Sequence, residues 1–223
     1  MKKILVIAPH PDDETLGCGG TLLRHVAEKD EIFWLVISET HEPQWSAETI
    51  QIKSDEVAAV AEAYGMQDYF KLGLPAIRLD TLPLADMIRR IKAVIANIRP
   101  EVVYLVHGGD VNSDHSMVFD ATMSVLKTFY MRQCGVQRIL SYEALSSTEA
   151  APPQPHRAFV PNVYYDITPY LERKLEIMSL YKSEAHPDPM PRGPSAIQAL
   201  ARYRGASIAV DYAEAFMLVR EVR

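Results

Sequence analysis

The chain has 223 residues, which suits one domain, and its 48% hydrophobic and 23% charged residues exclude a disordered, collagen-like or coiled-coil architecture. The formal net charge is -6 and no basic block is present, so nucleic-acid binding is not expected, because neutralising phosphates requires clustered cations. Two cysteines, Cys18 and Cys134, are too few for a disulfide framework, and a cytoplasmic protein is therefore expected.

No membrane association is expected either. The longest apolar runs, such as Ile4–Ala8, are far too short to span a bilayer. The start of the chain, two lysines followed by five apolar residues, is similar to the beginning of a signal peptide. The run stops at Pro9, however, which leaves too short an apolar segment, and the pattern favours a buried first strand.

Strand-like and helix-like segments alternate through the first 145 residues. Short apolar runs predict strands at Lys3–Ala8, Ile32–Ile37, Phe70–Leu74, Val102–Val106 and Arg138–Leu145. Apolar residues at helical spacing predict helices at Gly19–Lys29, 46–64, Pro83–Ile98 and 116–130.

Continuous apolar strands that alternate with helices predict an α/β fold, a Rossmann-like open and mostly parallel sheet with helices on both faces. We expect residues 1–223 to form a single domain. Residues 1–145 are its α/β core, and residues 146–223 supply proline-rich loops and C-terminal elements that shape the substrate site. In such sheets the ligand lies at the carboxyl ends of the strands.

The loop after the first strand, His10-Pro11-Asp12-Asp13-Glu14, holds an imidazole and three carboxylates. A divalent cation compensates such a concentration of negative charge, and His with Asp suits zinc or a similar first-row ion. His10 and Asp13 are three residues apart, so both side chains can face one metal ion. Asp12 lies between them and can point at a water molecule bound to that ion. The alternative is a polar loop in which Asp12 or Asp13 caps the next helix.

The glycines of Gly17-Cys18-Gly19-Gly20 do not form a dinucleotide fingerprint, because acidic residues occupy the strand–helix turn where a pyrophosphate binds. We interpret these glycines as allowing close packing of the helix on the sheet. A phosphorelay receiver domain is disfavoured too, because no lysine follows the late strands.

The loop after strand 102–106 is the second polar cluster, at the same edge of the sheet. His115 opens the next helix and is the expected third metal ligand, since three protein ligands with an open position describe a catalytic zinc site. His107 is interpreted as a structural loop histidine. His25, His41 and His156 have no such context and are predicted to lie on the surface.

The segment Ala8–Gly20 resembles the opening motif of the PIG-L/LmbE-like zinc-dependent N-deacetylases, and Asp110-x-Asn112-x-Asp114-His115 resembles their second motif. Weaker similarities follow in order along nearly the whole chain. They are Lys53-x-x-Glu56, Ser146-Ser147-Thr148-Glu149, Tyr181-Lys182-Ser183-Glu184, Pro191-Arg192 and Ala213-Glu214-Ala215-Phe216.

The resemblance implies a Rossmann-like fold with one zinc ion, or another divalent first-row metal, held by His10, Asp13 and His115. It implies that Asp12 is the general base and that the substrate is a small N-acetylated amino sugar or its glycoside, cleaved to acetate and a free amine. Asp114 is expected to orient Asn112 or a metal ligand.

This sequence departs from the common family pattern at three positions. Asn112 stands where many members have a histidine, so Asn112 can support the oxyanion through a hydrogen bond but cannot transfer a proton. Lys53 replaces an arginine and Met190 replaces a histidine. The general acid is therefore left open: either Asp12, once protonated, or another group returns the proton to the nitrogen.

Substrate contacts are expected from Lys53, Asp110 and Arg192, with Trp45 as a further candidate; the alternative for Lys53 is an ion pair with Glu56 on the helix surface. Two alternative functions stay open: hydrolysis of another N-acyl bond, such as formyl or carbamoyl, and non-catalytic binding of a metal or sugar. The sequence also leaves open whether the chain forms homo-oligomers.

Overall fold

The computed structural model describes residues 1–223, which form a seven-stranded sheet of order β3-β2-β1-β4-β5-β7-β6. The first five strands are parallel, and β7 runs antiparallel to both β5 and β6. This confirms the predicted open, mostly parallel α/β sheet. The strands are β1 (Lys3–Ala8), β2 (Glu31–Glu39), β3 (Asp68–Pro75), β4 (Val102–Val106), β5 (Arg138–Tyr142), β6 (Val163–Asp166) and β7 (Ala213–Glu221).

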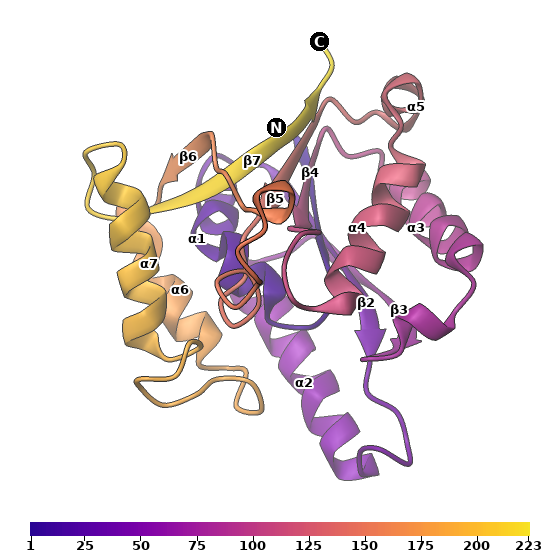
Figure 1. Cartoon of the computed structure of the whole chain (residues 1–223), viewed down its shortest axis with the longest axis horizontal. Helices are drawn as coiled ribbons and strands as arrows, with labels where there is room; N and C mark the ends of the chain where they lie inside the picture. The colour runs from indigo at the N-terminus through magenta and orange to yellow at the C-terminus, as the bar shows by residue number, and fades with distance from the viewer.

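Helices cover both faces of the sheet (Figure 1). Alternate residues of β1 point to opposite faces: Ile4 and Val6 belong to one apolar core, Leu5 and Ile7 to the other. The first core is closed by α1 (Asp13–Ala27), α2 (Ala47–Tyr64), α6 (Leu171–Met178) and α7 (Pro194–Ala206), and the second by α3 (Leu84–Ile98), α4 (Ser113–Val125) and α5 (Thr128–Cys134). No helix combines the length and the apolar character needed to cross a membrane.

Three predicted elements differ from the structure. The first helix begins at Asp13 rather than at Gly19, so the acidic loop residues form its first turn. The segment 116–130 is not one helix, because the backbone leaves the helical region at Leu126 and a second helix starts at Thr128. The strand predicted at Arg138–Leu145 ends at Tyr142, since the chain then turns.

The sequence patterns did not indicate the C-terminal elements. All four residues of β6 are only half-buried, and α7 buries only Ile197, Ala201 and Gly205, so neither shows a clear apolar period. Nevertheless β7 pairs with β5, which joins the C-terminal part of the chain to the same sheet.

The glycines of α1 allow close packing, as predicted. A Cβ on Gly17 would lie 2.1 Å from the ring of Tyr142, and one on Gly20 would lie 2.8 Å from the side chain of Ile167. Between them Cys18 leaves the helical conformation (φ -141°, ψ 17°), so α1 is broken in the middle. The break leaves backbone donors and an acceptor without their usual helical partners.

A buried ion pair from the C-terminal part of the chain satisfies those backbone groups. The carboxylate of Glu214, on β7, accepts hydrogen bonds from the backbone N–H groups of Gly20 (2.8 Å) and Thr21 (2.7 Å). Lys174, on α6, donates to the carbonyl of Leu16 (2.9 Å) and pairs with Glu214 at 2.7 Å. The broken middle of α1, just after the turn that carries the acidic loop residues, is therefore anchored to α6 and β7.

The sheet has its topological switch point at β1, which lies between β2 and β4. The chain passes from β1 to β2 and β3 on one side and then returns to β4 on the other. The loops that follow β1 and β4 consequently meet over one crevice, which is where open α/β sheets bind ligands.

Candidate metal centre and active site

The two polar loops converge on one point. Donor atoms of His10, Asp13 and His115 all lie within 4.8 Å of one another. Oδ2 of Asp13 is 3.2 Å from Nδ1 of His10 and 3.3 Å from Nε2 of His115. The two imidazole rings have their centroids 5.4 Å apart. Residues far apart in the sequence therefore present three metal-ligating atoms to a common centre.

Two further carboxylates orient the imidazoles from outside this cluster. Asp114 Oδ2 lies 3.0 Å from Nε2 of His10, and Asp110 Oδ2 lies 2.6 Å from Nδ1 of His115. With the imidazole protons on these outer nitrogens, the inner nitrogens carry lone pairs that point toward Asp13. The expected substrate contact of Asp110 has to be corrected, because its side chain is fully buried against His115 and does not line the cavity.

The donor set fits a divalent metal. Nε2 of His115 is buried and has no hydrogen-bond partner, which is costly for a polar atom unless a cation uses its lone pair. Burial works against charge on His10, but hydrogen bonds to Asp114 and Asp13 raise its pKa to about 9. Burial opposes charge on His115 as well, yet the charge of Asp13 and the Asp110 contact raise its pKa to about 10. The carboxylates around the two imidazoles therefore favour positive charge at this point, which a bound divalent cation also supplies.

Asp12 is the carboxylate that the cluster leaves free. Its backbone is in a left-handed conformation (φ 108°, ψ -29°), which is uncommon for a residue other than glycine and often marks a functional site. The Asp12 N–H donates to Glu14 Oε2 at 3.2 Å. Burial and the neighbouring charge of Asp13 raise the pKa of Asp12 well above its usual value, although the nearby Arg192 opposes this.

Glu14 holds the backbone of Asp12 by accepting its N–H. Its side chain is fully buried, and burial raises its pKa to about 7 although hydrogen bonds from Thr15 and Tyr181 work in the opposite direction. Tyr181, just after α6, donates its hydroxyl to Glu14 at 2.7 Å. The C-terminal part of the chain therefore reaches the base of the acidic loop.

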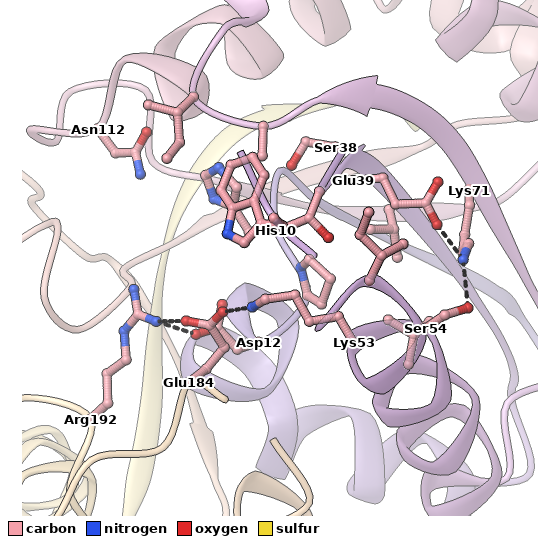
Figure 2. A pocket seen from close by; sticks show the side chains of 18 residues that line it. His10, Asp12, Ser38, Glu39, Lys53, Ser54, Lys71, Asn112, Glu184 and Arg192 are labelled. Carbon is pink, nitrogen blue, oxygen red and sulfur yellow. Dashed lines mark hydrogen bonds and ion pairs between the residues drawn. The ribbon is translucent and has the colours of Figure 1, made fainter. Parts of the chain in front are cut away.

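A cavity of about 230 Å³ opens beside Asp12 and His10 (Figure 2). Trp45 lines it, and so do Ser38 and Glu39 at the end of β2. Lys71, on β3, forms an ion pair with Glu39 and donates to Ser54 at 3.1 Å. The cavity offers an aromatic face together with several hydrogen-bonding groups, a combination suited to a small polar ligand.

Alternating charges cross one wall of this cavity, as Figure 2 shows. Lys53 on α2 pairs with Glu184, and the other oxygen of Glu184 lies 2.7 Å from NH1 of Arg192. The same guanidinium nitrogen is 2.8 Å from Oδ2 of Asp12. The surface pair predicted as the alternative for Lys53 does not form, because Glu56 instead accepts two hydrogen bonds from Ser183.

Asn112 also lines the cavity, and in Figure 2 it lies on the other side of His10 from this charged wall. It is also the N-cap of α4: its Oδ1 accepts a hydrogen bond from the backbone of Asp114 at 3.0 Å. The side-chain amide nitrogen of Asn112 is therefore the part that is free to donate to a ligand.

Two histidines outside the cluster have structural partners. His107 Nε2 donates to the carbonyl of Arg157 at 2.8 Å, in keeping with the structural interpretation. The prediction that His25 lies on the surface is wrong: it is buried between Asp30 and the hydroxyl of Tyr104, each at 2.9 Å. Tyr104 is far away in the sequence, and Asp30 contacts His25 only because the chain turns at the end of α1, so the helical pattern around His25 did not indicate either contact.

Sequence reasoning assigned no role to several residues at the site. Glu184 belongs to the Tyr181-Lys182-Ser183-Glu184 motif, which could have identified it as a site residue. Glu39 is an acid at the carboxyl end of the second strand, a position that could have identified it in the same way. Lys71 and Ile77, which lie in or just after the weakly patterned third strand, gave none.

Comparison with known proteins decides the family. Residues 5–126, more than half of the chain, match the PIG-L family, described as GlcNAc-PI de-N-acetylase. The chain is a member of this family. This confirms the resemblance drawn from the two motifs, and it places the chain among deacetylases.

Two similar proteins match the chain over most of their length. An Escherichia coli K12 protein named "Uncharacterized deacetylase YaiS" is 29% identical over 188 residues, which are 82% of this chain and 91% of that protein. The conserved protein TT1542 from Thermus thermophilus has a solved structure that matches with a TM-score of 0.78 and 27% identity, covering 100% of this chain and 97% of the other.

One protein of similar structure is named as an enzyme of another class, a hydratase. GalB, a 4-carboxy-2-hydroxymuconate hydratase from Pseudomonas putida KT2440, matches with a TM-score of 0.76 at 18% identity, covering 100% of this chain and 98% of GalB. At this identity the likeness shows the fold alone. The reaction must accordingly be argued from the residues of the site.

Proposed function

We propose that this PIG-L family member is a metal-dependent hydrolase that removes the N-acetyl group from a small amino sugar or amino-sugar conjugate. Water adds its oxygen to the acyl carbon, the C–N bond breaks, and acetate and a free amine result. The observation that carries the proposal is the convergence of His10, Asp13 and His115 beside the separate carboxylate of Asp12 at the cavity wall. The family description, GlcNAc-PI de-N-acetylase, supports an N-acetylated amino-sugar conjugate as the substrate class.

His10, Asp13 and His115 are the residues that hold the ion, and zinc suits two imidazoles and one carboxylate. When bound, zinc supplies a Lewis acid that lowers the pKa of water and stabilises negative charge on the acyl oxygen. Asp110 and Asp114 keep the two imidazoles in the required tautomer.

Asp12 performs the proton transfers. Its carboxylate takes a proton from the attacking water and returns it to the departing nitrogen, so one residue acts as base and then as acid. The left-handed backbone and the Glu14 contact fix the direction of the Asp12 side chain, and Arg192 stabilises its ionised form. The free amide nitrogen of Asn112 donates a hydrogen bond to the acyl oxygen as charge develops there.

The cavity wall binds the sugar. Lys53 and Arg192 face the cavity with donors that suit hydroxyl oxygens, and the indole of Trp45 offers a flat apolar surface for a sugar ring. Glu184 joins the two cations and so sets their spacing.

An amine-release screen tests this function. The purified protein, stripped of metal and reloaded with zinc, is incubated with N-acetylglucosamine, its nucleotide conjugates and simple glycosides, and acetate and free amine are measured together. We expect equal amounts of both products, dependence on added zinc and loss of turnover in Asp12→Asn. The screen also includes N-formyl and N-carbamoyl analogues. Release of amine from one of these analogues, with no acetate release from the N-acetyl substrates, would replace the proposed acyl group. No amine release from any substrate would overturn the function.

A further inference from the structure

Ile77 combines two features that are each unfavourable. Its backbone φ of 63° is left-handed, and in that region a β-branched residue is an outlier. Its side chain is also 69% exposed, so no burial in the core compensates for the conformation. Ile77 is the second residue after the end of β3, and it lines the cavity.

Hydrogen bonds on both sides hold the Ile77 backbone in place. The N–H of the preceding Ala76 donates to the carbonyl of Glu39 at 3.0 Å. The N–H of Ile77 donates to Asp114 Oδ2 at 2.7 Å, and the same oxygen contacts Nε2 of His10 at 3.0 Å. One carboxylate oxygen thus joins the Ile77 backbone to a residue of the metal cluster.

Ile77 therefore places an apolar side chain at the metal end of the cavity. The other large apolar residues of the lining, Val36, Trp45, Ile50 and Val57, come from β2, α2 and the segment between them. Their backbones make no hydrogen bond to the metal cluster or to its orienting carboxylates, whereas that of Ile77 does.

The shape of a secondary amide says what such a side chain can contact. An amide is planar and trans, so the acyl substituent and the nitrogen substituent point to opposite ends of the C–N bond. With the carbonyl carbon beside the cluster and Asp12, and the sugar toward Lys53 and Trp45, the acyl substituent points back to the metal end. An apolar wall at that end suits a methyl group.

We propose that Ile77 is the residue that determines acyl specificity: its side chain packs against the acyl substituent and sets the largest acyl group that the site accepts. This inference rests on the proposed hydrolysis of N-acyl amino sugars. The Ile77 N–H donates to Asp114 Oδ2, which also contacts Nε2 of His10, and these contacts hold the Ile77 backbone beside the metal cluster despite its left-handed conformation. A single methylene can change discrimination in an apolar pocket by roughly 10- to 200-fold.

The test compares kcat/KM for glucosamine carrying N-formyl, N-acetyl, N-propionyl and N-butyryl groups. The proteins are the zinc-loaded wild type, Ile77→Ala and the control Val111→Ala. Val111 is also exposed, at 53%, and lies in the neighbouring loop, but it does not line the cavity. Because the Ile77 side chain is mostly exposed, its truncation leaves no buried void, and an unchanged melting temperature checks the fold.

In Ile77→Ala we expect the ratio of propionyl to acetyl hydrolysis to rise about tenfold or more, with a larger rise for butyryl, while Val111→Ala keeps the wild-type ratios. Unchanged ratios in Ile77→Ala, with acetyl hydrolysis intact in the wild type, overturn the specificity role and leave the proposed function standing. If the wild type hydrolyses no member of the series, both proposals fall together.

Discussion

Arg192 contacts Asp12 from the opposite end of the chain: its NH1 lies 2.8 Å from Oδ2 of the candidate base. The same nitrogen contacts Glu184, and the guanidinium Nε donates to Ser146 at 3.0 Å. The proline-rich C-terminal loop thereby completes a site whose candidate metal ligands all belong to residues 10–115.

Arg192→Met is expected to lower kcat/KM for an N-acetylated amino sugar by roughly 10- to 100-fold, because truncating a hydrogen-bonded partly buried charge leaves Asp12 and Glu184 without their shared cation. Zinc content should not change, since Arg192 contacts no residue of the donor set. Steady-state kinetics and elemental analysis on the same preparation check both points. Loss of zinc in this variant would contradict the separation of the two roles.

Asp12→Asn is expected to keep its zinc and to lose about 10²- to 10⁴-fold in kcat, because an amide cannot accept the proton of water. His10→Ala and His115→Ala are expected to lose the metal instead, since each removes a donor of the cluster. Elemental analysis beside an acetate-release assay distinguishes the two classes. Full activity of Asp12→Asn would show that another group is the base.

The two carboxylates that orient the imidazoles are expected to contribute to zinc affinity. Asp110→Asn and Asp114→Asn are expected to weaken zinc binding by about 10- to 100-fold, because the imidazoles lose charged partners that fix their tautomer. Competition with a zinc chelator measures the affinity. Asp120→Asn, an exposed change on α4, the helix that carries Asp114, is the matched control; equal losses in all three variants would exclude a specific role for the pair.

Zinc affinity should rise with pH across the neutral range. In the metal-free protein the pKa of His10 is raised to about 9 and that of His115 to about 10, so both imidazoles are protonated at pH 7. Zinc binds the deprotonated form and must displace these protons, so affinity is low below both pKa values and levels off above them. Calorimetry in buffers of different ionisation enthalpy counts the released protons; we expect about two at pH 7, one from each imidazole. Release of none would contradict this assignment.

The buried pair under the broken helix is expected to contribute strongly to stability. Glu214→Ala should lower the free energy of unfolding by about 3–5 kcal/mol, because it leaves the charge of Lys174 buried and unpaired. Asp211→Ala, which breaks the exposed pair with Arg202, should cost less than about 1 kcal/mol. Urea denaturation compares the two variants, and similar losses would show that the buried pair has no special weight.

The sequence alone determined the parallel half of the fold and the location of the site. Val102–Val106 and its counterparts are continuous apolar runs, and the hydrophobic effect forces such runs into the interior of a sheet covered on both faces. Because parallel strands end at one edge, the His10 and His115 loops had to lie at that edge. The spacing within each motif is local, so its residues could be recognised without a structure.

Only the tertiary structure decided which distant groups meet. Asp110 and Asp114 stand in one motif, yet each orients a different imidazole, because the turn into α4 directs their side chains differently. Lys174 and Glu214 carry no periodic signal, and their pairing depends on how the C-terminal elements close over α1. The position of Ile77 at the metal end of the cavity depends on a hydrogen bond to Asp114, an acceptor far away in the sequence. Such contacts follow from packing between elements, and the order of residues along one segment does not contain them.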